Sequence, residues 1–552
     1  MNNKTRQIIV VVSVFVIALA SLGTVIGLLV GTGRLSEYSG GFTYTLSGTR
    51  ATITGYDGDD TDIVIPNKVR GNRVVAIAKD AFSSKANTIK SIKIDTKSSS
   101  FTLADEAFKD LTSLEKVVLP EGLKEISAGA FSGCKVLRDV IIPDSVTLIG
   151  DKAFYNCSAL KFAYKNEEYS TEGENAIDYE VFYMPSGLLE IGANAFENCT
   201  AMIGAHFNKS LTKIGVEAFY KASAFTELTV EEDCELASIG NSAFQSTRLR
   251  SNANYLLNFP HLTAIGDKAF ADITTNFTQF KFPATVTSVG ADAFKGSSSL
   301  ATVMFEDGIK LETMGEGVFQ DCTYLSSIEL PESIKTIPAK AFMGCTRLLY
   351  NTDFKIGKNV ETIGEGAFAI YTNNATYSRR EIVVDSENEN FAILKLQDFN
   401  KSNTTSTYKH GLLTNADSTV VYAYFGSYDK NSTNSGGSRF RFYDESGMQI
   451  TSIEEIKSYA FAGVAFEDMR LPKTVKTFGE YVFFESDDFL VVYIESINWT
   501  WQKTTFNKKT DGSPDIDVMI LNTTEATRGE VTEFKMLLGA DGIYAGDASA
   551  DQ

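Results

Sequence analysis

Apolar side chains recur along this chain in a spacing that repeats about every two dozen residues. Segments such as Leu114–Pro120 (LEKVVLP), Leu137–Pro143 (LRDVIIP) and Leu325–Pro331 (LSSIELP) are apolar at their first, fourth and sixth positions. The later positions alternate as in a β-strand with one buried face, and the final Pro ends the strand because it has no backbone N–H to donate. Each segment therefore predicts a short strand, and a second short apolar piece such as Val146–Gly150 follows it.

The string IGDKAF comes after such segments and occurs twice, at Ile149–Phe154 and Ile265–Phe270. Twelve related strings bring the number of copies to fourteen. The copies end at Phe82, Phe108, Phe131, Phe154, Phe196, Phe219, Phe244, Phe270, Phe294, Phe319, Phe342, Phe368, Phe461 and Phe483. Most steps between these Phe residues are 22 to 26 residues, while steps of 42 and 93 residues indicate insertions. A fixed period in the twenties is typical of a leucine-rich-repeat solenoid.

The second position of each string is Gly in nine copies, but Pro338 fills it once. Pro holds φ near −65° and suits the first residue of a helical turn, so this position does not require a positive φ. We therefore expect one short helical turn in each coil. The Phe is present in every copy, and we expect the rings to stack into a buried spine because a single coil cannot bury its own apolar face.

Five of the six cysteines occupy one position of the repeat, three residues after the Phe. They are Cys134, Cys157, Cys199, Cys322 and Cys345. This periodicity predicts a column of small buried side chains, and a disulfide framework is the alternative interpretation. Cys234 lies outside this register and is a candidate free thiol.

The N-terminal segment has the pattern of a membrane anchor. Residues 8–30 carry no charge and follow Lys4 and Arg6. About 20 apolar residues cross a bilayer as a helix, and basic residues before the helix favour a cytoplasmic N-terminus. We therefore expect a single-pass anchor in the cell membrane with the repeats outside the cell. The alternative is a signal peptide cleaved near Ala20, which would release the protein.

Three glycines of this apolar segment, Gly23, Gly27 and Gly31, are four residues apart and share one helix face. Small residues at that spacing let two membrane helices approach closely, which predicts packing of the anchor into a dimer. The alternative is that they only reflect the high frequency of Gly in membrane helices.

Together these patterns predict an α/β repeat fold, mostly β. We expect a leucine-rich-repeat solenoid of about 14 coils, each with one or two short strands and one short helical turn, preceded by an N-terminal transmembrane helix. The expected organisation is a cytoplasmic tail (1–7), the anchor (8–30), the solenoid with an N-terminal cap and a hairpin insertion near 163–185 (31–368), an insertion or long hairpin repeat (369–455), the last two repeats (456–496), and a C-terminal cap and tail (497–552). Within the long insertion, Gly411–Phe425 reads as two strands around a turn at Asn415–Ser418.

The opening segment Phe42–Phe82 and the recurring pattern LxxVxLPxxLxxIGxxAFxxC resemble the BspA-type (Treponema-type) leucine-rich-repeat proteins. The resemblance covers roughly residues 42–368 and 453–490. It implies a surface protein of a bacterium, a eukaryotic parasite or a mucosal microbe, which binds host matrix proteins, other cells or surface polymers and is not an enzyme. The chain departs from the family in its N-terminal anchor, and its insertions and the segment from Ile497 onward lack clear repeat character.

Composition excludes several other classes of function. The net charge of −19 argues against a sequence-independent nucleic-acid binder, which needs a basic surface. There is no CxxC pair and the three histidines are far apart in sequence, so neither a metal site nor another cofactor is expected. Asp57–Asp62 (DGDDTD) lacks the Gly and Glu of an EF-hand loop and reads as a turn.

We therefore expect a non-enzymatic, adhesin-like surface protein whose partner is an extracellular protein or glycan. The outward strand residues form the expected ligand-facing set: Lys116, Asp139, His206, Glu227, Thr229, Gln279, Lys281, Ser327, Glu329, Asp468 and Arg470. The first alternative is a structural envelope protein that self-associates without a host ligand. The second, and weaker, alternative is an enzymatic activity. It would have to lie within the C-terminal segment, because the repeats contain no acid–base pair, nucleophile or metal cluster.

Overall fold

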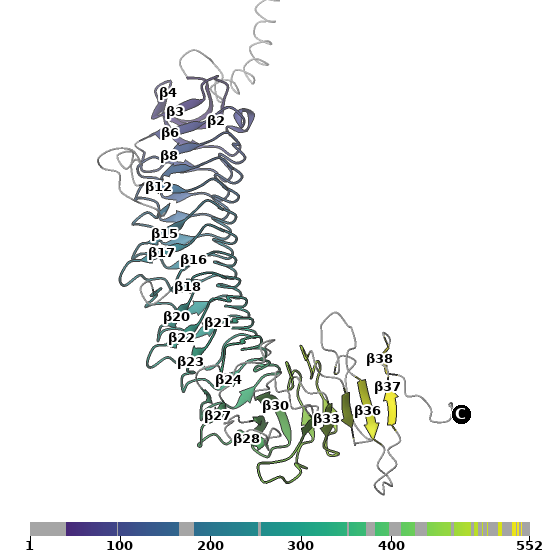
Figure 1. The fold of residues 1–552 in the computed structure, drawn as a ribbon. Helices are drawn as coiled ribbons and strands as arrows, with labels where there is room; N and C mark the ends of the chain where they lie inside the picture. Colours follow the sequence, from purple (N-terminus) through teal and green to yellow (C-terminus); the bar gives the residue numbers. More distant parts are fainter. Residues whose placement is uncertain are drawn as a thin grey trace, which may run out of the picture. The chain divides into compact units, whose positions relative to one another are not determined.

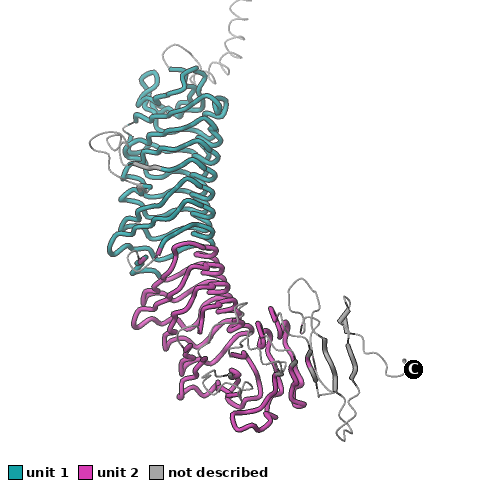
Figure 2. Tube along the Cα trace, in the orientation of Figure 1, with its two compact units in different colours: residues 1–250, 257–262 teal, residues 251–256, 263–552 magenta. Residues whose placement is uncertain are grey.

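A computed structural model describes most of the chain between residues 40 and 543. The described residues are 40–96, 98–164, 182–251, 256–349, 353–370, 381–396, 410–425, 439–464, 468–486, 491–494, 500, 505, 517–521, 533–536, 538–539 and 542–543. Two compact units divide the chain (Figure 2): unit 1 comprises 1–250 and 257–262, and unit 2 comprises 251–256 and 263–552. In both units, successive coils stack their strands side by side (Figure 1).

Unit 1 begins with an antiparallel hairpin that caps the first coil. β1 (Phe42–Ser47) pairs with β2 (Arg50–Tyr56), and β2 continues in parallel to β5 (Asn72–Ile77). β4 (Lys68–Val69) and β7 (Thr102–Leu103) also pair with β5. The buried rings of Phe42 and Tyr56 lie 5.1 Å apart and close the apolar end of the stack.

The coils of unit 1 form two parallel ladders. In the long-strand ladder, the strands β3 (Asp62–Pro66) and β6 (Ser91–Asp95) show the buried alternation that the apolar pattern predicts. The ladder continues with β8 (Lys116–Val118), β10 (Asp139–Ile141) and β12 (Phe162–Tyr164), then β13 (Phe182–Tyr183), β15 (Gly204–Phe207) and β17 (Glu227–Val230). The short-strand ladder contains β9 (Glu125–Ile126), β11 (Leu148–Ile149), β14 (Glu190–Ile191), β16 (Lys213–Ile214) and β18 (Ser238–Ile239). Residues 165–181, within the expected insertion, lie outside the described residues.

Unit 2 continues the same plan with shorter groups of paired strands. Its long strands lie in separate sheets. The first contains β20 (Gln279–Phe282), β22 (Thr302–Phe305) and β23 (Ser327–Ile328), and the second contains β25 (Phe354–Ile356) and β27 (Ile382–Val384). Further along, another contains β31 (Arg439–Arg441), β33 (Asp468–Leu471), β35 (Val491–Ile494), β36 (Asp517–Leu521) and β37 (Glu533–Met536). Its short strands pair as β19 (Ala264–Ile265) with β21 (Ser288–Val289), and β24 (Thr336–Ile337) with β26 (Thr362–Ile363). A final pair joins β38 (Leu538–Gly539) and β39 (Gly542–Ile543).

The segments around each repeat Phe form a third element, which we call the turn column, and it is not helical. The residue two before the Phe has a positive φ in all fourteen copies, from Asp80 (55°) to Tyr481 (48°). A left-handed residue cannot continue a right-handed helix, so the expected helical turn is wrong. Among the described residues, the one helix is the single 3-10 turn η1 (Ser83–Lys85).

Hydrogen bonding explains why the turn column takes this form. The N–H groups of Ala153 and Cys157 donate within their own coil, to the carbonyls of Gly150 (3.2 Å) and Phe154 (3.1 Å). The N–H of Phe154 donates to the carbonyl of Ala195 in the next coil, at 2.8 Å. Hydrogen bonds within one coil thus alternate with hydrogen bonds to the next coil, and together they pair the backbone N–H and C=O groups of a buried turn. A short helix would leave the backbone groups at its ends unpaired.

The Phe rings form the expected spine within each unit. Phe154 stacks on Phe131 and on Phe196 with both ring centroids 5.3 Å away, so the spine passes without a break across the 42-residue step. All three rings are fully buried. Burial of each ring contributes about 1.5–3 kcal/mol, as does burial of each fully buried Leu, Val or Ile of the same coil.

The glycines at the second position of the string have ordinary φ values, as the presence of Pro338 predicts. Their role is instead close approach between coils. A Cβ on Gly215 would lie 2.5 Å from the carbonyl carbon of Gly192 in the preceding coil. The backbone spacing of the stack therefore excludes a side chain at most of these positions.

The cysteines form the expected buried column, and all six are free. The Cys134 thiol donates to the carbonyl of Phe108 and the Cys157 thiol to that of Phe131, each at 3.1 Å. Burial raises the pKa of Cys134 to about 12. Off-register Cys234 is also buried and donates to the carbonyl of Asn208 at 3.3 Å. These thiols therefore act as small core groups rather than as nucleophiles.

The 93-residue step contains a coil that the Phe pattern does not reveal. β28 (Phe391–Leu396), β29 (His410–Asn415) and β30 (Val420–Phe425) form an antiparallel meander, and β29 and β30 are the two strands expected around Asn415–Ser418. β30 then pairs in parallel with β32 (Glu455–Ile456), which pairs with β34 (Thr477–Phe478).

Tyr424 of β30 takes the place of a spine residue. Its ring stacks on Phe461 at 5.9 Å, and its N–H donates to the carbonyl of Ala460 at 2.7 Å, as a repeat Phe does in other coils. The segment around Tyr424 therefore stands in for one turn of the column, without the Phe by which the other copies are recognised.

The expected membrane segment cannot be compared with the structure. Residues 1–39, which include the anchor at 8–30, the cleavage site near Ala20 and Gly23, Gly27 and Gly31, lie outside the described residues. From residue 40 onward, the described part of the chain contains no helix with the length and apolar character that crossing a bilayer requires.

Candidate binding surface

The outward side chains of the long strands form the candidate surface, and we call it the strand face. In unit 1, Lys116 of β8 and Asp139 of β10 occupy the same register position on paired strands. Partial burial raises the pKa of Asp139, and the neighbouring Lys116 opposes this rise. This pair is local to its two coils and presents one cation beside a partly buried carboxyl group.

A second group in unit 1 combines three of the expected residues. His206 Nδ1 lies 2.7 Å from Thr229 Oγ1, and His206 Nε2 lies 3.5 Å from a carboxylate oxygen of Glu231. Glu227 lies 3.5 Å from Arg250. These polar groups therefore interact with one another across neighbouring coils.

In unit 2, Gln279, Thr302 and Ser327 occupy one row of paired strands. Lys281 lies in the next outward row, and its Nζ is 2.7 Å from Glu306 Oε1. The ion pair with Lys281, together with the N–H of Ala284, lowers the pKa of Glu306. Lys281 is therefore a neutralised cation of the strand face.

The last two expected residues lie on β33 in unit 2. The register of β31 and β33 places Asp468 opposite Arg439 and Arg470 opposite Arg441. Arg470 is exposed. The expected set thus divides into separate local groups, and Ser327 and Glu329 contribute to a concave site.

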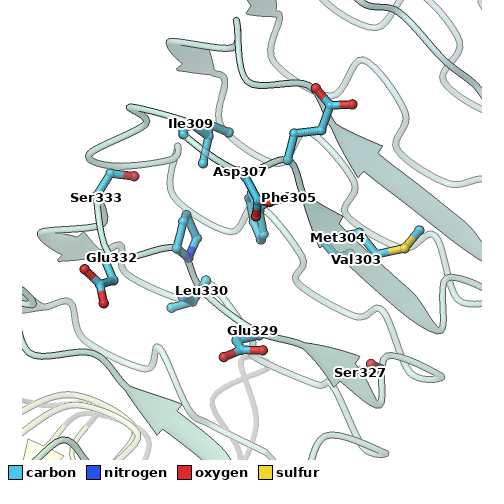
Figure 3. A pocket seen from close by; sticks show the side chains of 13 residues that line it. Val303, Met304, Phe305, Asp307, Ile309, Ser327, Glu329, Leu330, Glu332 and Ser333 are labelled. Atoms are coloured by element: carbon cyan, nitrogen blue, oxygen red, sulfur yellow. The ribbon is translucent and has the colours of Figure 1, made fainter.

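That concave site is a groove of about 720 Å³ in unit 2, lined by residues 303–309, 327 and 329–333 (Figure 3). It forms where strand pairing stops. β20 and β22 pair along four residues, from Gln279–Thr302 to Phe282–Phe305. β22 and β23 pair only at Thr302–Ser327 and Val303–Ile328, so the two chain segments separate beyond that point.

Two extra residues in one loop build the outer wall of the groove. Phe282 and Val289 are seven positions apart (289 − 282), whereas the equivalent Phe305 and Met314 are nine apart (314 − 305). Gly308 in this longer loop has a φ of 80° and no heavy atom within 4 Å of an added Cβ. Gly308 is therefore an open position of the loop, while Ile309 beside it is buried.

The lining combines apolar side chains with carboxylates (Figure 3). Met304, Phe305, Ile309, Leu330 and Pro331 supply the apolar surface, and Glu306, Asp307, Glu329 and Glu332 supply the carboxylates. None of the thirteen lining residues is a Lys, Arg or His. The groove is therefore an acidic and partly apolar depression.

Two of the four carboxylates form an ion pair with a lysine. Glu306 is paired with Lys281 at 2.7 Å, and Glu332 lies 4.0 Å from Lys358. Asp307 and Glu329 are exposed, and within the described residues neither forms an ion pair. One cation that interacts with Glu329 is already paired: Lys355 lies 2.7 Å from Asp385. Asp385 raises the pKa of Lys355 most strongly, and Glu329 raises it further. The unneutralised negative charge is thus concentrated on Asp307 and Glu329.

Sequence reasoning identified Ser327 and Glu329 of this groove and missed Glu306, Asp307 and Glu332. The available signal was the greater length of the loop between Phe305 and Met314, together with its Asp307–Gly308 turn. Strand alternation alone does not indicate it, because the loop residues belong to no strand. Within the described residues, no three His, Cys, Asp or Glu side chains are grouped so that they could hold a metal ion.

Comparisons with known proteins place the chain among repeat proteins. A family model described as the BspA type leucine-rich repeat region matches residues 75–182, 174–256, 263–392 and 440–513. No curated protein matches the sequence.

Among solved structures, three similar chains come from bacteria. A leucine-rich repeat protein from Bacteroides ovatus is 18% identical over 82% of this chain and 92% of its own, with a TM-score of 0.43. A leucine-rich cell surface protein from Faecalibacterium prausnitzii is 25% identical over 60% of this chain and 86% of its own, with a TM-score of 0.36. The pneumococcal vaccine antigen PcpA is 16% identical over 87% and 92%, with a TM-score of 0.39.

Proposed function

Because the chain belongs to the BspA-type leucine-rich-repeat family, we propose that it is a surface protein that binds extracellular macromolecules through its strand face, without catalysis. The partner is an extracellular protein or a glycan. Residues 8–30 would hold the protein in the cell membrane with the repeats outside the cell.

The observation that carries this proposal is the contrast between the two sides of the long strands. In β20 the inward Phe280 and Phe282 are fully buried, while Gln279 and Lys281 face outward. Paired coils repeat the inward apolar residues but differ at outward positions, as in the row of Gln279, Thr302 and Ser327. A rigid scaffold with variable polar positions suits recognition of a macromolecule rather than a chemical step.

The direct test is a binding experiment on the full-length chain in a mild detergent. Matrix proteins, plasma proteins and glycans would be passed over the immobilised protein at physiological salt and followed by surface plasmon resonance. We expect saturable binding that weakens at least tenfold in a variant carrying Lys281→Ala, Glu329→Ala and Arg470→Ala. The matched control carries Lys268→Ala and Glu361→Ala, two exposed positions outside the strand face.

Three results would change this proposal. A chain that polymerises with concentration but binds nothing in the panel would support the structural, self-associating alternative. Binding that survives the triple substitution but disappears on deletion of residues 381–450 would move the function from the strand face to the meander. An intact mass that begins after Ala20 would show a secreted protein rather than an anchored one.

A further inference from the structure

The groove beside β22 and β23 has properties that select one kind of occupant. We propose that it binds an extended segment of a partner protein that carries Arg or Lys next to apolar side chains. This inference rests on the proposed function and specifies the chemistry of the ligand. The cationic group would lie between the carboxylates of Asp307 and Glu329, and the apolar neighbours would contact Met304 and Leu330.

The shape of the groove favours a segment of chain over a folded surface. Its volume of about 720 Å³ lies within the range of sites that enclose a small ligand. The site is bounded by two separating stretches of backbone, residues 303–309 and 329–333 (Figure 3). A depression between two chain segments is the kind of site in which peptide-binding proteins hold a few residues of an extended chain.

The charge of the groove favours a basic ligand. Four carboxylates line it and Lys281 and Lys358 neutralise only two of them. Asp307 and Glu329 are left as exposed anions on opposite walls, one on the long loop and one beyond β23. An Arg or Lys side chain placed between them would gain charge-assisted hydrogen bonds to both walls.

The apolar lining distinguishes a peptide from a free cation. Met304, Phe305, Leu330 and Pro331 offer methylene and ring surface that a metal ion cannot use. Within the described residues, no three acidic, His or Cys side chains come close enough together to hold a metal ion. An Arg or Lys side chain can use both kinds of lining, because its aliphatic stem packs on apolar surface and its charged head group pairs with carboxylates.

The test uses the full-length chain and two labelled hexapeptides, one of alternating Arg and Leu and one of alternating Glu and Leu. Fluorescence polarisation would measure binding at low and at physiological salt. We expect the Arg peptide to bind and the Glu peptide not to bind, with affinity for the Arg peptide falling as salt rises. The double variant Asp307→Asn with Glu329→Gln should weaken this binding at least tenfold.

A matched control carries Glu361→Gln and Glu389→Gln, which remove the same number of exposed carboxylates from unit 2 outside the groove. It should bind the Arg peptide as the parent chain does. Deletion of Asp307 and Gly308 would restore the loop length of the preceding coil and should abolish binding. Circular dichroism and the denaturant midpoint of each variant would verify that it remains folded.

The inference is overturned if both peptides bind equally, if the groove variants bind as well as the control, or if Ca²⁺ alone binds the groove and excludes the Arg peptide. Macromolecular binding that depends on Lys281 and Arg470 but not on Asp307 and Glu329 would also overturn it, while leaving the proposed function standing. Absence of any macromolecular ligand in the panel would instead overturn the proposed function itself.

Discussion

The turn column and the strand face are built from the same coils but tolerate very different variation. In the turn column, Phe fills the same position in all fourteen copies, and Ala or Val precedes it each time. On the strand face, Gln279, Thr302 and Ser327 occupy one row with three different side chains. The difference shows that stacking is determined inside the coil, while the outward strand positions accept different side chains without disturbing it.

The contrast has a physical cause. A ring in the turn column contacts the rings of two neighbouring coils, so a change in one coil disturbs three. A strand-face side chain contacts its neighbours mainly through polar interactions in water, which contribute little to stability. The comparison predicts large effects on folding at the first set of positions and effects on binding at the second.

The largest effect should follow from Phe154→Ala. This ring is fully buried between Phe131 and Phe196, and its removal leaves a cavity in the middle of the spine. We expect a loss of about 3–5 kcal/mol in the free energy of unfolding, measured by urea denaturation. Glu329→Ala on the strand face should change it by no more than about 0.5 kcal/mol. Equal losses in the two variants would contradict the division between the two regions.

A smaller loss is expected from Gly215→Ala in the close contact between coils. The new Cβ would lie 2.5 Å from the carbonyl carbon of Gly192, so the backbone of the stack must shift. We expect destabilisation of about 1–3 kcal/mol. Gly357→Ala is the matched control, since nothing lies within 4 Å of its added Cβ and its φ is ordinary. There the change should stabilise by about 0.4–1 kcal/mol, and stabilisation at both positions would be evidence against close approach.

The sequence was sufficient to predict the repeat, the spine and the cysteine column because each depends on a side chain that recurs at one position. It was not sufficient to predict the turn column. The residues two positions before the Phe include Asp80, Lys152 and Tyr481, and these side chains share no property that predicts a left-handed conformation. Their φ follows from hydrogen bonds to the next coil, which no single repeat contains.

The hidden coil and the groove were missed for a similar reason. Tyr424 takes a spine position without the preceding pattern, and only its stacking on Phe461 identifies it. The groove depends on where β22 and β23 stop pairing, which is a relation between two coils. Strand alternation identified Glu329 but could not show that Asp307 lines the same groove.

The left-handed positions predict an unusual preference for glycine. Lys268 is exposed and has a φ of 56°, a conformation that Gly adopts more readily than residues with a Cβ. Lys268→Gly should therefore be more stable than Lys268→Ala by about 0.5–1 kcal/mol, the reverse of the order in a helix. Thermal and urea denaturation of the two variants would measure this difference. Greater stability of the Ala variant would restore the helical interpretation of the turn.

The smallest effects should come from two carboxyl groups whose pKa values are shifted in opposite directions. Glu106 of the turn column pairs with Lys109 (2.6 Å) and Lys79 (2.5 Å), which lower its pKa to about 2. Burial raises the pKa of Asp139 on the strand face. The lowered pKa means that Glu106 stabilises the fold above pH 4.5 and that this contribution is lost as the pH falls toward 2. The raised pKa means that ionised Asp139 destabilises the fold at neutral pH, and that this effect disappears as the pH falls below 3.8.

Substitution of each carboxyl group should therefore change stability with opposite signs. At pH 7, Glu106→Gln should lower the urea midpoint and Asp139→Asn should raise it, because the first removes a favourable ion pair and the second removes a partly buried charge. Both differences from the parent chain should shrink as the pH falls toward 2, since the parent carboxyl groups take up protons over this range. Urea titrations at several pH values would measure both variants against the parent. A loss of stability at pH 7 in both variants would mean that Lys116 outweighs burial at Asp139, and that the strand face is held by ion pairs as the turn column is.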